Sequence, residues 1–273
     1  MRRTAVLIMM AVLAVPAIAA SQELVPAVKR AMLFPGSLNV SIGTLAPTER
    51  NNVLTTVRAE QGVTAWRKGS MFVVGFVDAT KRHDSAGLSW NRTAPTTAGV
   101  KLMSTTGNGV VQVVAGVTAQ TVNQRSARVT RALYATYWNG WSGSFASTHS
   151  RVLPDAFPGQ MYASSGYVSA AEPDNWVSSA AIQQGTTVIR RYGVAVIPYI
   201  GAAVTADTAG YNWNNRSDLE GGVKVARTLP GGGVIEMAVA KRSQFNRITH
   251  ESHTRPIVSM NYWMGWAPRH MSR

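Results

Sequence analysis

Hydrophobic and polar residues alternate one by one along much of this chain. In the segment 258–266, one face would carry Val258, Met260, Tyr262, Met264 and Trp266, and the other Ser259, Asn261, Trp263 and Gly265. The segments 111–118, 219–225 and 235–240 alternate in the same way. A period of two is typical of β-strands that have one apolar face. The pattern therefore predicts an all-β chain.

The second half of the chain repeats the first at an offset of 123 residues. The matched positions are Gln61-Gly62 with Gln184-Gly185, Asp84 with Asp207, Gly87 with Gly210, Trp90-Asn91 with Trp213-Asn214, and Lys101 with Lys224. After two single-residue insertions, Tyr137-Trp138 falls on Tyr262-Trp263. Each unit is too long for a solenoid repeat and has room for six strands. We expect about twelve strands in two repeats, one at about 38–143 and the other at about 160–267.

Strand and connection lengths favour a barrel in a membrane. Most predicted strands are roughly 9–15 residues long, close to the 9–11 that a membrane-spanning strand needs. Short connections at 67–69, 105–109, 190–193 and 229–233 alternate with long ones at 81–94, 207–218 and 243–255. Such alternation is typical of outer-membrane barrels, whose short turns are periplasmic. The fold class that we predict is a transmembrane β-barrel, antiparallel and closed, of about twelve strands.

The first residues read as a secretory signal. Arg2 and Arg3 precede a short apolar run at 5–15, and Ala17-Ile18-Ala19 forms a small-x-small cleavage site. We expect cleavage near Ala19, which removes 1–19 and leaves 254 of the 273 residues. No later window has the roughly 18 uninterrupted apolar residues of a membrane helix. The expected order is a signal at 1–19, a short segment at 20–37, a barrel at 38–267 and an extension at 268–273, in a Gram-negative outer membrane.

Composition narrows the chemistry. The chain has no cysteine, which excludes disulfides and thiolate catalysis. Its net charge of +14 falls to +12 when the signal, which contains two arginines, is removed. This balance indicates anionic partners such as lipopolysaccharide or an acidic polysaccharide, or simply solvated loop charge. Nucleic acid is excluded as a partner because the signal directs the chain out of the cytoplasm.

Several charged residues fall on the polar face of the predicted strands. These candidates for the barrel lumen are Arg58, Glu60, Lys101, Arg131, Glu220, Lys224, Glu236 and Arg242. An arginine- and lysine-lined lumen would select anions. Equally, the glutamates could pair with the cations and plug the lumen.

The repeated Asp-x-x-Gly-x-x-Trp-Asn segment is the candidate loop site. Its residues are Asp84, Trp90, Asn91, Asp207, Trp213 and Asn214. Either the tryptophans stack on a sugar or a phage protein, or the aspartates form local turns with Gly87 and Gly210 at positive φ. We favour the structural interpretation, because two opposed positions seldom serve one ligand. Six other tryptophans lie near predicted strand ends, where interface girdles belong, namely Trp66, Trp138, Trp141, Trp176, Trp263 and Trp266.

Catalytic and metal chemistry have little support in the sequence. His250, Glu251 and His253 share a predicted loop, for which we favour a solvated loop over a metal site. No nucleophile, base and orienting group stand at a recognisable spacing. We therefore expect no enzyme activity, no metal and no cofactor.

The motifs also resemble a known family, the bacteriophage-adsorption outer-membrane proteins of the NfrA type, in their C-terminal barrel. The matching segments are Glu60-Gln61-Gly62 with Trp66, residues 84–87, Trp90-Asn91 and Gly99-Val100-Lys101, with second copies at Gln183-Gln184-Gly185, 207–210, Trp213-Asn214-Asn215 and Gly222-Val223-Lys224. More loosely, the chain is similar to exopolysaccharide-secretion barrels. It departs in the short segment 20–37, where the family has a long helical-repeat region, and in seven residues after Trp266. We expect a stand-alone barrel.

The pattern and the resemblance together indicate a surface binder or narrow conduit for an anionic or sugar polymer. A plugged structural or phage-receptor-like barrel is the first alternative. A soluble secreted glycan-binding β protein is the second, and the alternation of loop lengths argues against it. The sequence leaves the oligomeric state open.

Overall fold

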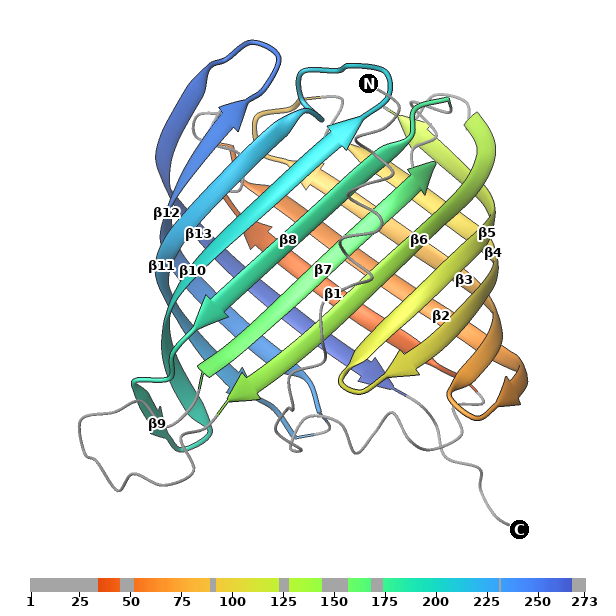
Figure 1. The fold of residues 1–273 in the computed structure, drawn as a ribbon, viewed down its shortest axis with the longest axis horizontal. Coiled ribbons are helices and arrows are strands. Elements are labelled where there is room, and N and C mark those ends of the chain that lie inside the picture. The colour runs from red at the N-terminus through yellow and green to blue at the C-terminus, as the bar shows by residue number, and fades with distance from the viewer. Residues whose placement is uncertain are drawn as a thin grey trace.

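The computed structural model describes residues 34–44, 52–88, 92–122, 128–143, 157–167, 174–230 and 232–266. These residues form one closed antiparallel β-barrel (Figure 1). The predicted signal with its cleavage site and the extension at 268–273 lie outside the described residues. No helix in the described part of the chain is long and apolar enough to cross a membrane.

Each strand pairs with its neighbour in sequence, and the last pairs with the first. The strands are β1 (Gly36–Gly43), β2 (Leu54–Lys68), β3 (Met71–Asp84), β4 (Thr93–Thr106), β5 (Gly109–Val122), β6 (Arg128–Gly143), β7 (Phe157–Tyr167), β8 (Val177–Gly185), β9 (Ile189–Arg191), β10 (Val194–Asp207), β11 (Arg216–Thr228), β12 (Val234–Asn246) and β13 (Ser252–Trp266). Because β8 and β9 pair with the same edge of β10, they are one interrupted strand. The described residues thus form twelve strands around the ring, which confirms the predicted fold class. β1 closes it against β13, from Gly36↔Trp266 to Gly43↔Ser259.

Tight hairpins lie at one end of the barrel. Gly69-Ser70, Gly107-Asn108 and Tyr192-Gly193 connect consecutive strands there, and Gly69 and Gly107 have φ of 58°. Such turns require positive φ, which glycine adopts without steric cost. Longer connections, at 85–92 and 208–215, lie at the other end. The connection 144–156 joins β6 to β7, between the two repeats, at the tight-turn end. It is nevertheless long, and the predicted alternation of short and long connections did not include it.

The outer surface of the barrel is apolar. Alternate residues of the strands form an exposed belt that includes Val63, Val77, Val100, Val113, Val117, Leu133, Ile182, Ile200, Leu219, Val223, Met237, Val239 and Val258. Register partners in an antiparallel ladder lie on the same face, and Val239 pairs with both Val223 and Val258. Inward-facing residues of β3 such as Phe72, Val74 and Phe76 are buried. A continuous exposed apolar belt exceeds what water-soluble monomers normally show.

The same contacts fasten both seams between the repeats. Trp141 Nε1 donates to Gln184 Oε1 at 2.8 Å, and Trp266 Nε1 donates to Gln61 Oε1 at 3.1 Å. Each tryptophan ends one repeat, and its glutamine belongs to the other repeat. The indole rings lie over Gly159 and Gly36, where an added Cβ would come within 2.3 Å of the ring. These contacts recur at the spacing of the sequence repeat, within two residues.

Candidate functional site

Two matched lysines lie on the inner wall. Lys101 Nζ donates to Glu60, two strands away, and is 5.2 Å from the ring centroid of Phe76. At the equivalent position, Lys224 Nζ donates to Gln183 at 2.7 Å and is 5.7 Å from the centroid of Tyr199. Lys224 also pairs with Glu236 at 3.2 Å. Each lysine is therefore held by an acceptor and an aromatic face.

Arginines on the inner wall also face carboxylates. Arg58 Nε donates to Asp78 Oδ2 at 2.5 Å, and its Nη2 is 3.9 Å from Glu60. In the second repeat, Arg242 donates to Glu220, which also accepts from the hydroxyl of Tyr199. Carboxylates thus neutralise these cations, so the inner wall of the described barrel is not a purely basic ring.

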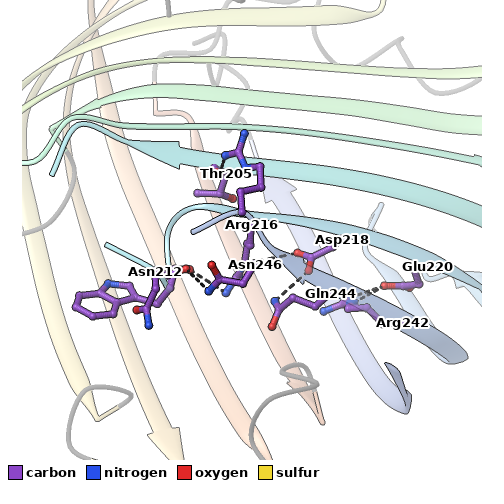
Figure 2. A network of polar contacts seen from close by, with 10 residues as sticks. Thr205, Asn212, Arg216, Asp218, Glu220, Arg242, Gln244 and Asn246 are labelled. Atoms are coloured by element: carbon purple, nitrogen blue, oxygen red, sulfur yellow. Dashed lines mark hydrogen bonds and ion pairs between the residues drawn. The ribbon is translucent and has the colours of Figure 1, made fainter. Parts of the chain in front are cut away.

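A ladder of polar contacts follows β11 and β12 towards the long-loop end (Figure 2). Beyond the Arg242–Glu220 pair, Gln244 Nε2 donates to Asp218 Oδ1 at 3.0 Å, and Arg216 Nε lies 3.6 Å from Asp218. Asn246 Nδ2 then donates to the carbonyl of Asn212 at 2.9 Å. Because alternate residues of a strand share a face, residues 216, 218 and 220 all reach the lumen.

A cavity of about 400 Å³ lies beside this ladder. Its lining includes Gln160, Tyr162, Gln183, Glu220, Arg242 and Asn261. These side chains supply hydrogen-bond donors, acceptors, paired charges and an aromatic ring. The cavity can therefore hold water or a hydroxyl-rich solute, and it offers little to a strongly charged ion that would have to compete with the existing pairs.

Seven of the eight candidate lumen residues lie on the inner wall, namely Arg58, Glu60, Lys101, Glu220, Lys224, Glu236 and Arg242. The prediction for Arg131 is wrong. It pairs in register with outward-facing Val117, and its side chain is 68% exposed. There it lies 3.8 Å from Asp174 and 5.1 Å from the centroid of Tyr167. A long cation near a strand end reaches water from the apolar face, so charge alone did not reveal its side.

Sequence reasoning missed the aromatic and amide members of the site. Tyr199 occupies the place of Phe76, and Gln183 that of Glu60, at the repeat offset of 123 residues. Following the candidate Glu60 to its repeat partner would have found Gln183, whereas Tyr199 is the partner of Phe76, which was not a candidate. Asp218 carries no such signal, because Pro95 stands at its repeat position. Gln244 does have an identical counterpart, Gln120, at the offset of 124 that follows the first insertion.

The candidate loop aspartates make matching local networks. Buried Asp84 accepts from Asn52 Nδ2 at 2.7 Å and from the Leu88 backbone at 2.9 Å. Asp207 accepts in the same way from Asn175 at 2.9 Å and Tyr211 at 3.2 Å.

Further contacts at this end of the barrel fit the structural interpretation. Gly87 and Gly210 have φ of 80° and 76°. Asn214 Nδ2 donates to Asp207 at 2.9 Å, and Trp213 stacks on Tyr211 with centroids 4.6 Å apart. Trp90 and Asn91 lie outside the described residues. The contacts of Asp84 and Asp207 are those of turn-forming residues.

Replacing Asp207 by alanine is expected to loosen the segment 208–215. The substitution removes the carboxylate that accepts hydrogen bonds from the amides of Asn175, Asn214 and Asn215, at a cost of about 1–3 kcal/mol. Limited proteolysis of the detergent-solubilised barrel should then cut within this segment. Asp174→Ala, which removes a pairing between exposed groups, should leave the digestion pattern unchanged. Equal cleavage of both variants would contradict the clamp role of Asp207.

Among the described residues, no group of three or more histidines or acidic residues could hold a metal ion. His253, which belongs to β13 and not to the predicted loop, lies 3.8 Å from Glu251.

The geometry defines a closed antiparallel barrel with an apolar outer surface and a polar inner wall. The chain is similar to the COG4313 outer membrane channel from Pseudomonas putida F1, at 8% identity and a TM-score of 0.46, over 92% of this chain and 100% of that one. It is also similar to the β domain of the Bordetella autotransporter BrkA, at 11% identity and a TM-score of 0.41, over 85% and 98%.

A third similar structure is the outer membrane channel DcaP of Acinetobacter baumannii, at 8% identity and a TM-score of 0.36, over 85% and 95%. Because all three TM-scores are below 0.5, the evidence for a barrel is the strand pairing of this chain and not these similarities. No protein-family model matches the chain. No curated protein matches it. The resemblance to the NfrA-type barrels stays a prediction.

Proposed function

We propose that this protein is an outer-membrane barrel whose narrow polar lumen binds or conducts a sugar polymer. The observation that carries the proposal is that the barrel is apolar on the outside and polar on the inside, the reverse of a water-soluble protein. Exposed valines, leucines and isoleucines encircle the outside, while ion pairs, amides and a cavity of about 400 Å³ lie inside. Lipid accepts the outer belt, and closure satisfies every backbone group within the hydrocarbon.

Outward-facing cations support a lipopolysaccharide environment. Lys81, Arg131 and Lys241 are exposed on the outer face, each towards the long-loop end of its strand. Cations at a membrane border attract anionic head groups, such as the phosphates of lipopolysaccharide. Arg191 and Arg227 are exposed on the outer face at the tight-turn end as well, so the proposed orientation, with the long connections at the cell surface, rests on the lengths of the connections.

The charge pattern inside favours a neutral, hydroxyl-rich polymer over a polyanion. Lys101, Arg58, Lys224 and Arg242 each face a carboxylate, so an anionic chain would have to displace existing pairs. Amides and hydroxyls, in contrast, can bind sugar hydroxyls without net charge. An exopolysaccharide segment is the ligand class that we propose, and the role is binding or passage without catalysis.

A plugged barrel is the second candidate. The first repeat packs Phe72, Val74 and Phe76 on the inner wall, and Lys101 there is 3% exposed. Such packing narrows one side of the lumen. A barrel closed in this way would serve as a structural or phage-receptor-like element.

Conductance across a planar bilayer separates these candidates. Purified wild type, shown to migrate differently on gels before and after boiling, should form channels of weak ion selectivity, because carboxylates pair with Arg58, Lys101, Lys224 and Arg242 on the inner wall. Glu220→Gln leaves the Arg242 charge without its carboxylate at the cavity wall and should move the reversal potential in a salt gradient towards chloride. Glu251→Gln, in a connection at the long-loop end, removes a charge of the same sign without touching this pair.

Each outcome bears on the proposal. A heat-shifted protein that forms no channels would favour the plugged barrel. A protein found in the soluble periplasm without a heat shift would overturn the membrane barrel and favour a soluble glycan-binding protein. Equal reversal potentials for Glu220→Gln and wild type would mean that ions do not pass along this wall.

A further inference from the structure

Two tryptophans predicted for the outer girdle instead face the lumen. Trp138 of β6 pairs in register with Tyr162, which lines the cavity. Trp263 of β13 shares a strand face with Asn261, which also lines the cavity. Since register partners and alternate residues share a face, both indoles are on the inner wall.

Each indole lies against a glycine of its own strand. A Cβ added at Gly140 would come within 2.9 Å of the Trp138 ring, and one at Gly265 within 3.1 Å of the Trp263 ring. Glycine thus lets the ring lie along the wall. The side chains are nevertheless 44% and 50% exposed, respectively. An aromatic ring that is supported along the wall and open elsewhere is a stacking platform.

The two platforms stand on opposite sides of the barrel. Five strands separate β6 from β13 in either direction around the ring, when β8 and β9 count as one. Trp138 pairs with Val110, next to the turn at Gly107-Asn108. Trp263 pairs with Val234, next to the connection 229–233. Both therefore lie near the tight-turn mouth of the lumen.

Amide side chains accompany both rings. Gln160 is the register partner of Gly140, beneath the Trp138 ring, and Asn39 is the register partner of Trp263. A hexose ring combines an apolar C–H face, which stacks on an indole, with hydroxyls at its rim, which bind amides. A purely apolar ligand would instead leave these amides without partners.

From these placements we infer that Trp138 and Trp263 are two stacking sites for the hexose rings of a neutral sugar chain at the tight-turn mouth. The inference rests on the proposed function and names the groups that would receive the polymer. A single sugar chain meets one platform on each side of the mouth. Stacking on opposite walls would hold the chain between two strands that stand across the barrel from each other.

Calorimetric titration of the detergent-solubilised, heat-shifting barrel with maltohexaose, cellohexaose and chitohexaose tests this inference. At least one of these should bind wild type, and Trp138→Ala with Trp263→Ala should raise its Kd about tenfold. Trp138→Phe with Trp263→Phe should recover much of the affinity, because an aromatic face remains. The matched control replaces Trp141 and Trp266, on the outer face of the same strands, by alanine and should leave Kd unchanged.

Conductance distinguishes failure of this inference from failure of the proposed passage. A channel that conducts ions but binds none of the three hexasaccharides overturns the stacking sites alone. Binding that survives the double alanine substitution also overturns them. Absence of both conductance and sugar binding overturns the passage itself. A gel heat shift in every variant verifies that the barrel has folded.

Discussion

Replacing Glu60 by alanine is expected to lower the free energy of unfolding by about 3–5 kcal/mol, the cost of leaving a buried ion without its partner. Lys101, which donates to Glu60, is 3% exposed, so water cannot take the place of the lost carboxylate. The ring of Phe76, 5.2 Å from Nζ, compensates only in part. Urea unfolding of the barrel in micelles, followed by tryptophan fluorescence, measures the change.

Two controls separate the buried charge from simple loss of packing. In the double variant Glu60→Leu with Lys101→Met, no charge stays unpaired, and stability should return close to that of wild type. Gln183→Ala is the matched change in the other repeat. It should cost less, because Lys224 keeps its pairing with Glu236 at 3.2 Å. A Glu60→Ala variant no less stable than Gln183→Ala would contradict the burial of the Lys101 charge.

The period-two pattern predicted the fold because a barrel strand meets two different surroundings. Val258 and Met260 face outward as their alternation indicates, and Ser259 and Asn261 face inward and line the cavity. The same rule failed at Arg131, whose charge suggested the lumen although its neighbours Val129 and Leu133 are exposed on the outer face. Near a strand end, where water reaches both faces, polarity no longer identifies the side.

Partner choice on the inner wall could not be predicted from the sequence. Lys101 and Glu60 are 41 residues apart and two strands apart, so their contact depends on the stagger of β2, β3 and β4. The odd or even position of a residue along its strand determines which face it lies on, but not its position along the barrel axis. The two inward tryptophans differ in this respect. The alternation already put Trp263 on the polar face with Ser259 and Asn261, whereas the inward direction of Trp138 is given by its register with Tyr162.

An arginine in the middle of the outer belt is the second large expected effect, and it tests the lipid contact directly. Val258 lies midway along β13, is 54% exposed and pairs with Val239 of the belt. In lipid, Val258→Arg should cost about 2–4 kcal/mol, the penalty for a cation near the bilayer midplane. Thr254→Arg, on the same face of β13 but at its long-loop end, should cost only about 0–1 kcal/mol.

Reversible urea unfolding in lipid vesicles gives both free energies, and recovery in the outer membrane gives a parallel measure in cells. The comparison is informative because the expected cost of Val258→Arg differs between the two surroundings, being large in lipid and small in water. On a water-facing surface, an arginine at the exposed Val258 position would be tolerated as well as one at position 254. A cost confined to position 258 therefore requires hydrocarbon around the middle of β13. Equal stability of the two variants would mean that water surrounds the belt, and the barrel would then have to cover its exposed valines and leucines with another protein surface.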